Sequence, residues 1–264
     1  MAFANINGIA LHYRIAGKVG CPVLVLANSL GTDARIWDEV IALLAPRHRI
    51  ISYDKRGHGL SDAPAGDYTL DDHVEDLAGL LDFLKIERLA LAGVSVGGLI
   101  AQGFALRFPE RLDALVLCDT APKVGDAAMW TARMEAVRAN GLASILEPVM
   151  LRWFTPDFCR ERPEELAGYQ NMFTRMPVDG YVGTCATLRD ADLREAIGAI
   201  TTPTLVVCGS EDLSSPVALV QQTAAAIAGA RFEILDGVGH IPSIEQPGIL
   251  ANMMQRFLTE VGHG

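Results

Sequence analysis

The chain has 264 residues, 50% hydrophobic and 20% charged, a balance that excludes a disordered chain and permits one large folded core. Its formal net charge of −10 excludes the basic stripe that nucleic acid binding requires. No apolar run approaches the roughly 20 residues of a membrane span, and the first residues do not resemble a signal peptide. Five cysteines, an odd number without metal-ligand spacing, indicate reduced thiols. We therefore expect a cytoplasmic protein without nucleic acid or membrane partners.

Strands and helices alternate along the first part of the chain. The Asn7-Gly8 dipeptide predicts a tight hairpin between strands at Ala2–Ile6 and Ile9–Ile15. The continuous apolar run Val23–Ala27 predicts a strand covered on both faces. Further elements are expected, in chain order, at Ile36–Leu44 (helix), Arg49–Tyr53 (strand), Leu70–Leu84 (helix), Leu89–Ile100 (strand, then helix) and Ala114–Cys118 (strand). Such alternation predicts an α/β fold with a mostly parallel central sheet and helices on both faces.

The alternation stops between residues 122 and 195. This segment is helical throughout, for example at Ala127–Asn140 and Leu142–Trp153, and it holds seven of the 17 aromatic residues. Aromatic side chains in an inserted lid can shape an apolar pocket and exclude water, although packing of the helices alone would explain the same enrichment. We therefore expect a core, residues 1–121 and 196–264, and a helical cap, residues 122–195, between the sixth and seventh core strands.

Ser95 stands where an apolar strand turns directly into a helix. Gly93 and Gly97 flank it two residues away on either side. In this G-x-S-x-G setting the turn is so tight that neighbouring side chains have no room, and the serine hydroxyl is raised into a pocket. A serine hydroxyl is a weak nucleophile near neutral pH, so it needs a base, and the base needs an orienting acid. Ser95 is therefore the predicted nucleophile.

Two strand ends later in the chain supply the partners that Ser95 requires. His240, the predicted base, lies in a glycine-rich loop, and Asp212, the predicted acid, follows an apolar strand. Asp119, at the end of an earlier strand, stays a second candidate for the acid. Because ligands of parallel sheets bind beyond the carboxyl ends of the strands, we expect one crevice to collect the polar residues at those ends: Asn28, Asp54, Ser95, Asp119, Asp212 and His240.

Four motifs together resemble the α/β-hydrolase family over nearly the whole chain. They are the loop Asn28–Gly31, the run Asp54–Asp62, the turn around Ser95, and the G-x-G-H-x-P-x-x-E-x-P run Gly237–Pro247. Within that family the chain is most similar to the 3-oxoadipate enol-lactone hydrolases of bacterial aromatic degradation, on two signals: Asn28–Asp33 with Trp37, and Arg152–Thr155. The resemblance implies the fold with its inserted cap, and a serine hydrolase that needs no metal or cofactor.

The resemblance also implies roles for loop residues. The backbone N–H groups of Leu30 and Val96 would form the oxyanion hole. Asp54 and His58 would be structural, since the glycines beside His58 supply turn conformations. His12, His48, His73 and His263 lack spaced partners for a metal and are expected at the surface or in packing roles.

The substrate that the resemblance implies carries an acetate group, whose charge must be met inside an apolar cavity. We expect Arg133 to bind this carboxylate, with Trp130 and Trp153 as walls; a solvated arginine and packed tryptophans are the simpler interpretation. A general carboxylesterase or a haloperoxidase-like perhydrolase would share the same triad. A hydrolase-fold ligand sensor that signals through its cap is the non-enzyme alternative. The sequence leaves the oligomeric state open.

Overall fold

The Asn7-Gly8 dipeptide forms a hairpin turn between β1 (Ala2–Ile6) and β2 (Ile9–Ala16) in the computed structural model, which describes residues 2–264. Asn7 and Gly8 have φ angles of 50° and 83°. Two consecutive positive φ values fit the tight turn that matches the twist of paired strands, which explains the choice of asparagine and glycine.

The hairpin forms one edge of an eight-stranded sheet with the order β1-β2-β4-β3-β5-β6-β7-β8. β2 pairs antiparallel with β4, and the remaining neighbours from β4 to β8 are parallel. The six further strands are β3 (Val23–Ala27), β4 (Arg49–Tyr53), β5 (Leu89–Val94), β6 (Leu112–Cys118), β7 (Thr204–Gly209) and β8 (Arg231–Leu235). The central strand β5 is buried at every position, as expected for a sheet covered on both faces.

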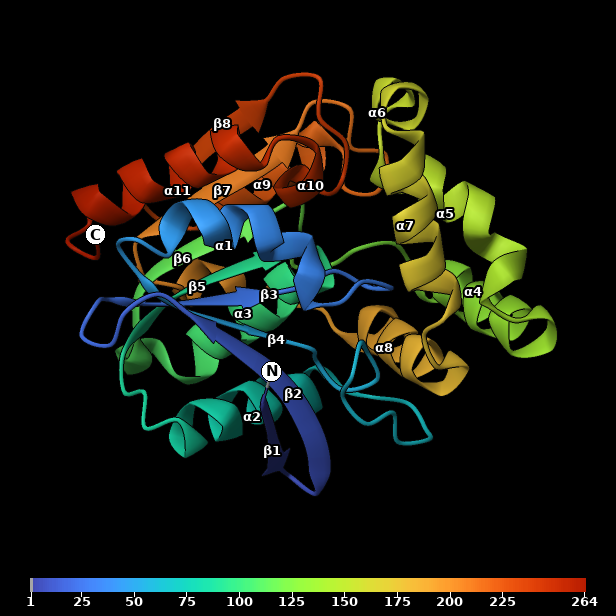
Figure 1. Ribbon diagram of the computed structural model, residues 1–264, viewed down its shortest axis with the longest axis horizontal. Coiled ribbons are helices and arrows are strands. Elements are labelled where there is room, and N and C mark those ends of the chain that lie inside the picture. Colours follow the sequence, from blue (N-terminus) through green and yellow to red (C-terminus); the bar gives the residue numbers. More distant parts are fainter. Residues whose placement is uncertain (1) are drawn as a thin grey trace.

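Helices cover the two faces of the sheet. Figure 1 shows α1 and α11 together on one face and α2 and α3 together on the other. The helices of the core are η1 (Ala34–Trp37), α1 (Asp38–Leu44), α2 (Leu70–Phe83), α3 (Val96–Arg107), η2 (Pro109–Arg111), η4 (Ile197–Ala199), α9 (Val217–Ala226), α10 (Pro242–Glu245) and α11 (Pro247–Glu260). The predicted α/β class is confirmed. The expected single helix Ile36–Leu44 instead begins as the 3-10 turn η1, in which the Asp33 side chain accepts the Arg35 N–H.

A second group of helices lies between β6 and β7 in the chain and beyond one end of the sheet (Figure 1). They are α4 (Ala127–Asn140), η3 (Leu142–Ile145), α5 (Leu146–Trp153), α6 (Pro156–Glu161), α7 (Pro163–Thr174) and α8 (Val178–Asp190). They fall within the segment 122–195, and we refer to them as the cap. The expected helix Leu142–Trp153 is divided into η3 and α5.

Helix α8 attaches the cap to the core by a backbone contact. A Cβ atom on Gly180 would lie 2.0 Å from the Gly57 carbonyl oxygen, so no larger residue fits there. Next to this contact, the Tyr68 N–H donates to the Gly183 carbonyl over 3.0 Å, and the Thr187 hydroxyl donates to the Tyr68 carbonyl. The side of the cap that contains α8 is therefore fixed to the segment between β4 and α2.

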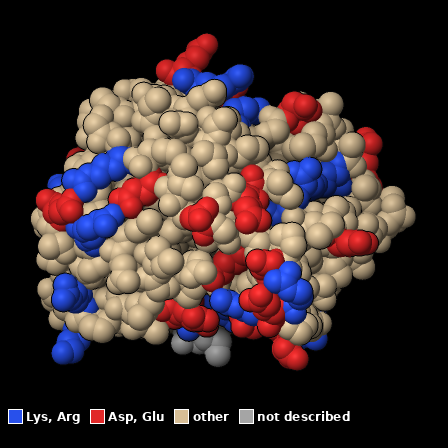
Figure 2. Space-filling model, turned by 90° about the horizontal axis from the view of Figure 1, so that it is seen from above, with Lys and Arg blue, Asp and Glu red and all other residues tan. Residues whose placement is uncertain are grey.

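The surface agrees with the acidic composition. On the face in Figure 2, Lys and Arg side chains lie in separate small groups, most of them beside Asp or Glu. Across residues 2–264, none of the helices combines the length and the apolar character needed to cross a bilayer.

Candidate active site

Ser95 occupies the sharp turn between β5 and α3. Its backbone has φ 58° and ψ −121°, a conformation that is costly for a residue with a side chain. A Cβ atom on Gly97 would lie 2.4 Å from the Ala27 carbonyl oxygen, and one on Gly93 would lie 2.3 Å from the Gly97 backbone. Both glycines are therefore required by close backbone approach. The turn leaves Ser95 only 8% exposed, in the wall of a cavity.

His240 and Asp212 form a buried pair next to this cavity. The His240 Nδ1 atom lies 2.9 Å from Asp212 Oδ2, and both side chains are almost inaccessible to solvent. The other Asp212 oxygen accepts the backbone N–H groups of Ser214 and Ser215, at 2.7 and 3.0 Å. With its Nδ1 proton directed at the carboxylate, His240 has Nε2 available as an acceptor. His240 and Ser95 line the same cavity.

Asp119, the alternative acid, lies behind this pair rather than in the cavity wall. Its Oδ1 accepts the Gly209 N–H over 2.8 Å, and it makes no hydrogen bond to His240 in the described chain. Burial and the neighbouring Asp212 carboxylate raise the pKa of Asp119 well above its ordinary value. The site of Asp119 thus disfavours a second negative charge beside Asp212.

Asp119, Cys208 and Asp212 also form the one cluster with metal-ligand spacing among residues 2–264, with ligand atoms within 4.8 Å of one another. Burial raises the pKa values of Cys208 and Asp119, which favours the protonated form of each group. Both Asp212 oxygens are already hydrogen bonded. A cation here would have to displace two protons and the His240 contact, so this donor set does not fit a metal.

The predicted oxyanion donors belong to two different loops. Leu30 lies in the loop after β3 and lines the same cavity as Ser95. Val96 is the first residue of α3, where the N–H groups of a helix have no partner within the helix. In the described chain, neither the Leu30 N–H nor the Val96 N–H donates to another protein group. Both N–H groups thus lack a protein acceptor, and Leu30 lines the cavity whereas Val96 is buried beside Ser95.

The cavity has a volume of about 90 Å³ and is closed mainly by the cap. Trp130, Arg133 and Trp153 all line it. The Trp130 ring is fixed by a 2.7 Å hydrogen bond from Nε1 to the Val124 carbonyl, and the Arg133 guanidinium lies 5.3 Å from the centre of that ring. These contacts order the side chains before any ligand arrives.

Two arginines beside the cavity have no carboxylate partner in the described part of the chain. Arg133 contacts the Tyr181 hydroxyl at 3.5 Å, and Arg152 donates to the Leu213 carbonyl at 3.1 Å. Other cap arginines, such as Arg138 and Arg189, are paired with acids. Sequence reasoning included Arg152 in a family motif but did not predict that it lines the cavity.

Sequence reasoning also missed the role of Glu245, which lies inside the glycine-histidine motif. Its carboxylate accepts the Gly239 N–H, and it accepts the Thr155 N–H and hydroxyl at 2.7 and 3.0 Å. The His240 N–H donates to the Trp153 carbonyl over 3.0 Å. The loop that carries His240 is therefore hydrogen bonded to the cap.

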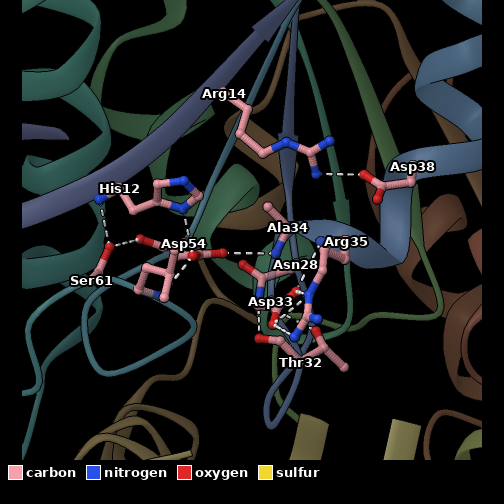
Figure 3. A network of polar contacts seen from close by, with 11 residues as sticks. His12, Arg14, Asn28, Thr32, Asp33, Ala34, Arg35, Asp38, Asp54 and Ser61 are labelled. Atoms are coloured by element: carbon pink, nitrogen blue, oxygen red, sulfur yellow. Dashed lines mark hydrogen bonds and ion pairs between the residues drawn. The ribbon is translucent and has the colours of Figure 1, made fainter. Parts of the chain in front are cut away.

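The expectation of one shared crevice is wrong for Asp119, as described above, and for Asn28 and Asp54. Asn28 is fully buried and donates to Thr32, and Asp54 binds His12 at 2.7 Å and the Ala34 N–H at 2.8 Å (Figure 3). Both side chains hold loops in place, because buried polar groups must find partners. The structural interpretation of Asp54 is consistent with these bonds. The other histidines expected at the surface or in packing are all buried: His12, His48, His73 and His263.

A larger hollow of about 790 Å³ lies between α7 and the core, but neither Ser95 nor His240 lines it. Its charged groups are largely paired already, Arg14 with Asp38 at 2.5 Å and Arg35 with Asp33 at 2.6 Å (Figure 3). We therefore place the candidate active site at the smaller cavity, which Ser95 and His240 both line.

This combination of a parallel sheet, a strained serine at the end of β5 and a buried Asp–His pair defines a class of hydrolytic enzymes. A profile described as the alpha/beta hydrolase family matches residues 24–253. The chain belongs to the α/β-hydrolase family.

Within this family, the chain is similar to enol-lactonases in both sequence and structure. The 3-oxoadipate enol-lactonase 2 of Acinetobacter baylyi is 37% identical over 239 residues, which cover 90% of this chain and 89% of that protein. The 3-oxoadipate enol-lactonase 1 of the same organism is 33% identical, with 97% and 96% covered. The crystal structure of the enol-lactonase from Burkholderia xenovorans LB400 matches with a TM-score of 0.96 at 38% identity, covering 98% of this chain and 100% of that one. The predicted resemblance to enol-lactone hydrolases is confirmed.

Proposed function

We propose that this chain is a serine hydrolase that opens 3-oxoadipate enol-lactone to 3-oxoadipate, a step in the breakdown of aromatic compounds. One observation carries the proposal: in an acidic protein, two arginines without carboxylate partners lie beside the cavity of a strained serine. Such a cavity favours a small substrate that combines an acyl group with a carboxylate. The names of the relatives agree with that chemistry.

The first half of the reaction acylates Ser95. His240 Nε2 accepts the hydroxyl proton as Oγ attacks the lactone carbonyl, while Asp212 stabilises the imidazolium that forms. The N–H groups of Leu30 and Val96 donate to the tetrahedral oxyanion, and each such donor is worth about 3–4 kcal/mol. Collapse breaks the ring C–O bond, and the enolate oxygen that leaves stays attached to the acyl chain. It takes the proton from His240 and ketonises, which favours ring opening.

The second half releases the product. His240 removes a proton from water, and the resulting hydroxide attacks the acyl carbonyl at the same oxyanion site. The Ser95–acyl bond breaks, Oγ recovers its proton from His240, and 3-oxoadipate leaves. No group beyond these side chains and water is required by this scheme.

The cap provides substrate binding in the proposal. Arg133, ordered against Trp130 and Tyr181, pairs with the substrate carboxylate, and Trp153 forms the opposite wall. Because Arg133 is partly buried beside the cavity, its ion pair is stronger than one in bulk water. Arg152 is a second cation within the same cavity wall.

The experiment follows loss of the ultraviolet absorbance of enzymatically generated 3-oxoadipate enol-lactone, beside p-nitrophenyl acetate. Fast loss of the lactone absorbance that requires Ser95 and far exceeds turnover of p-nitrophenyl acetate supports the proposal. The Ser95→Ala variant measures the rate without the nucleophile. Turnover of the activated ester alone would reassign the protein to a general esterase. Tight binding of the lactone with no multiple turnover would instead indicate a ligand sensor.

A further inference from the structure

Lys55 is a lysine inside the protein, directly after β4. It is 1% exposed, and its hydrogen-bond acceptors are two backbone carbonyls rather than a carboxylate. The Nζ atom lies 2.6 Å from the Ser29 oxygen and 3.3 Å from the Asn28 oxygen. Burying a lysine amine is costly, so its retention at this position calls for an explanation.

The Ser29 carbonyl shares a peptide group with the Leu30 N–H. In a planar trans peptide the C=O and the N–H point in opposite directions. A donor that holds the Ser29 oxygen on one side therefore directs the Leu30 N–H to the other side. Ser29 and Leu30 line the cavity of Ser95, and the Leu30 N–H has no other acceptor within residues 2–264.

A hydrogen bond to a peptide oxygen also polarises the amide and strengthens its N–H as a donor. The effect is largest when the donor carries charge. Burial lowers the pKa of Lys55 well below its ordinary value, while the negative charges of Asp54 and Asp33 act in the opposite direction. Amine and ammonium alike have enough N–H groups to reach both carbonyls.

The Ser29 carbonyl also accepts the Thr32 hydroxyl at 3.0 Å and, at 3.4 Å each, the Thr32 N–H and the Asn28 amide, all longer than the 2.6 Å bond from Lys55. Other contacts hold the rest of this loop. His58 Nε2 accepts the Gly31 N–H at 3.2 Å, and Asp54 accepts the Ala34 N–H at 2.8 Å. The Asn28 amide donates to the Thr32 carbonyl (Figure 3). Among the donors to the Ser29 carbonyl, Lys55 makes the shortest bond and is the one whose side chain can carry a positive charge.

We propose that Lys55 is a positioning residue of the oxyanion hole, which orients and polarises the Ser29–Leu30 peptide from the side opposite the substrate. The inference rests on the proposed serine hydrolase, but not on the identity of the lactone. It gives a catalytic purpose to a buried lysine that does not line the cavity.

The test compares Lys55→Met with wild type on p-nitrophenyl acetate, which requires only the nucleophile and the oxyanion hole. Methionine fills a similar volume without a donor. Because removal of a whole oxyanion donor costs about 10²–10³ in kcat, we expect kcat to fall about 10-fold to 100-fold. KM should change less than about 3-fold, because the carbonyl of the bound ester is not yet an oxyanion.

Arg111→Met is the matched control. Arg111 is a largely buried cation that donates to the Ile86 carbonyl over 2.7 Å, and it does not line the cavity of Ser95. This variant should lower Tm and leave kcat unchanged. If Lys55→Met lowers Tm while kcat stays at the wild-type value, Lys55 is structural and the inference is overturned.

Lys55→Gln keeps the test decisive if the methionine variant does not fold. Its shorter amide keeps a polar group at the site but cannot reach Ser29 at the same distance, so kcat should again fall with KM nearly unchanged. An unchanged kcat in this variant would overturn the inference. A wrong assignment of the substrate can be told apart from a wrong role for Lys55. In that case the wild-type protein would not turn over the lactone but would still show Ser95-dependent turnover of the ester. Absence of turnover on both substrates would overturn both proposals.

Discussion

Glu245 and Thr155 join the loop of the base to the cap. The Glu245 Oε1 atom lies 2.7 Å from the Thr155 nitrogen and 3.0 Å from its hydroxyl, although the two residues are 90 positions apart in the chain. The other Glu245 oxygen accepts the N–H of Gly239, the neighbour of His240. The carboxylate therefore fixes the backbone on which the base stands.

Replacing Glu245 by glutamine should destabilise the protein and slow catalysis together. Glutamine has one acceptor oxygen, so its NH₂ group would face either Thr155 or the Gly239 N–H. A buried donor without an acceptor costs about 1–3 kcal/mol, and each kcal/mol lowers Tm by about 2–4 °C in a chain of this size. Calorimetry measures Tm, and ester turnover measures kcat. Unchanged values of both would show that the Glu245 contacts are dispensable.

The two buried aspartates should respond differently to replacement by asparagine. Asp212→Asn removes the charge that orients His240, and a loss of about 10³–10⁴ in kcat is expected. Asp119→Asn keeps an acceptor for Gly209 and a donor toward Asp212, so kcat should fall less than about 10-fold. Steady-state kinetics of the two variants on one ester decides the assignment. The reverse order of losses would make Asp119 the catalytic acid.

Arg133→Ala should weaken binding of substrates that carry a carboxylate. A hydrogen bond to a charged group contributes about 1.5–3 kcal/mol, which corresponds to a rise in KM for the lactone of about 10-fold to 100-fold. The KM for p-nitrophenyl acetate should stay unchanged, because that ester is neutral. Arg138→Ala, on the same helix but paired with Asp67, is the control and should alter neither value. An unchanged KM for the lactone in Arg133→Ala would refute the assignment.

Stability should decrease as the pH falls below about 6.5. Burial lowers the pKa values of His48, His58 and His73, so between the ordinary and the lowered values the unfolded chain binds more protons than the folded one. Each histidine then removes up to about 1.4 kcal/mol of unfolding free energy per pH unit. Urea unfolding between pH 7.5 and 5.5 measures the slope, and a flat profile would contradict the prediction.

His73→Leu isolates one part of this effect. The side chain of His73 is buried, and in the described chain its two ring nitrogens have no hydrogen-bond partner. Leucine removes the titrating group without breaking a bond, so the pH slope should decrease by about one third. A slope equal to that of wild type would assign the pH dependence to other groups.

Local patterns in the sequence predicted the elements of the core well. The turn at Asn7-Gly8, the strand Val23–Ala27 and the glycines around Ser95 each depend on conformations that neighbouring residues specify. Tight turns and strands buried on both faces leave a strong local pattern, because few residues satisfy them.

Contacts between distant segments could not be predicted in the same way. Lys55 meets Ser29 across 26 positions and Glu245 meets Thr155 across 90, and nothing near either residue indicates its partner. Asp54 lies at a strand end, as a catalytic residue would, yet it holds the loop at Ala34. Residue type shows which bonds a side chain can make, whereas the packed fold decides which of them form.

The hydrogen bond from the His240 N–H to the Trp153 carbonyl bears on how this enzyme could be redesigned. A chimera that exchanges α4–α8 for the equivalent helices of another relative would replace the acceptor that holds the backbone of the base. Its rate would then change along with its substrate preference. Specificity and turnover are thus coupled here, and a transplanted cap would have to place a backbone carbonyl where Trp153 has one and carry a residue equivalent to Thr155.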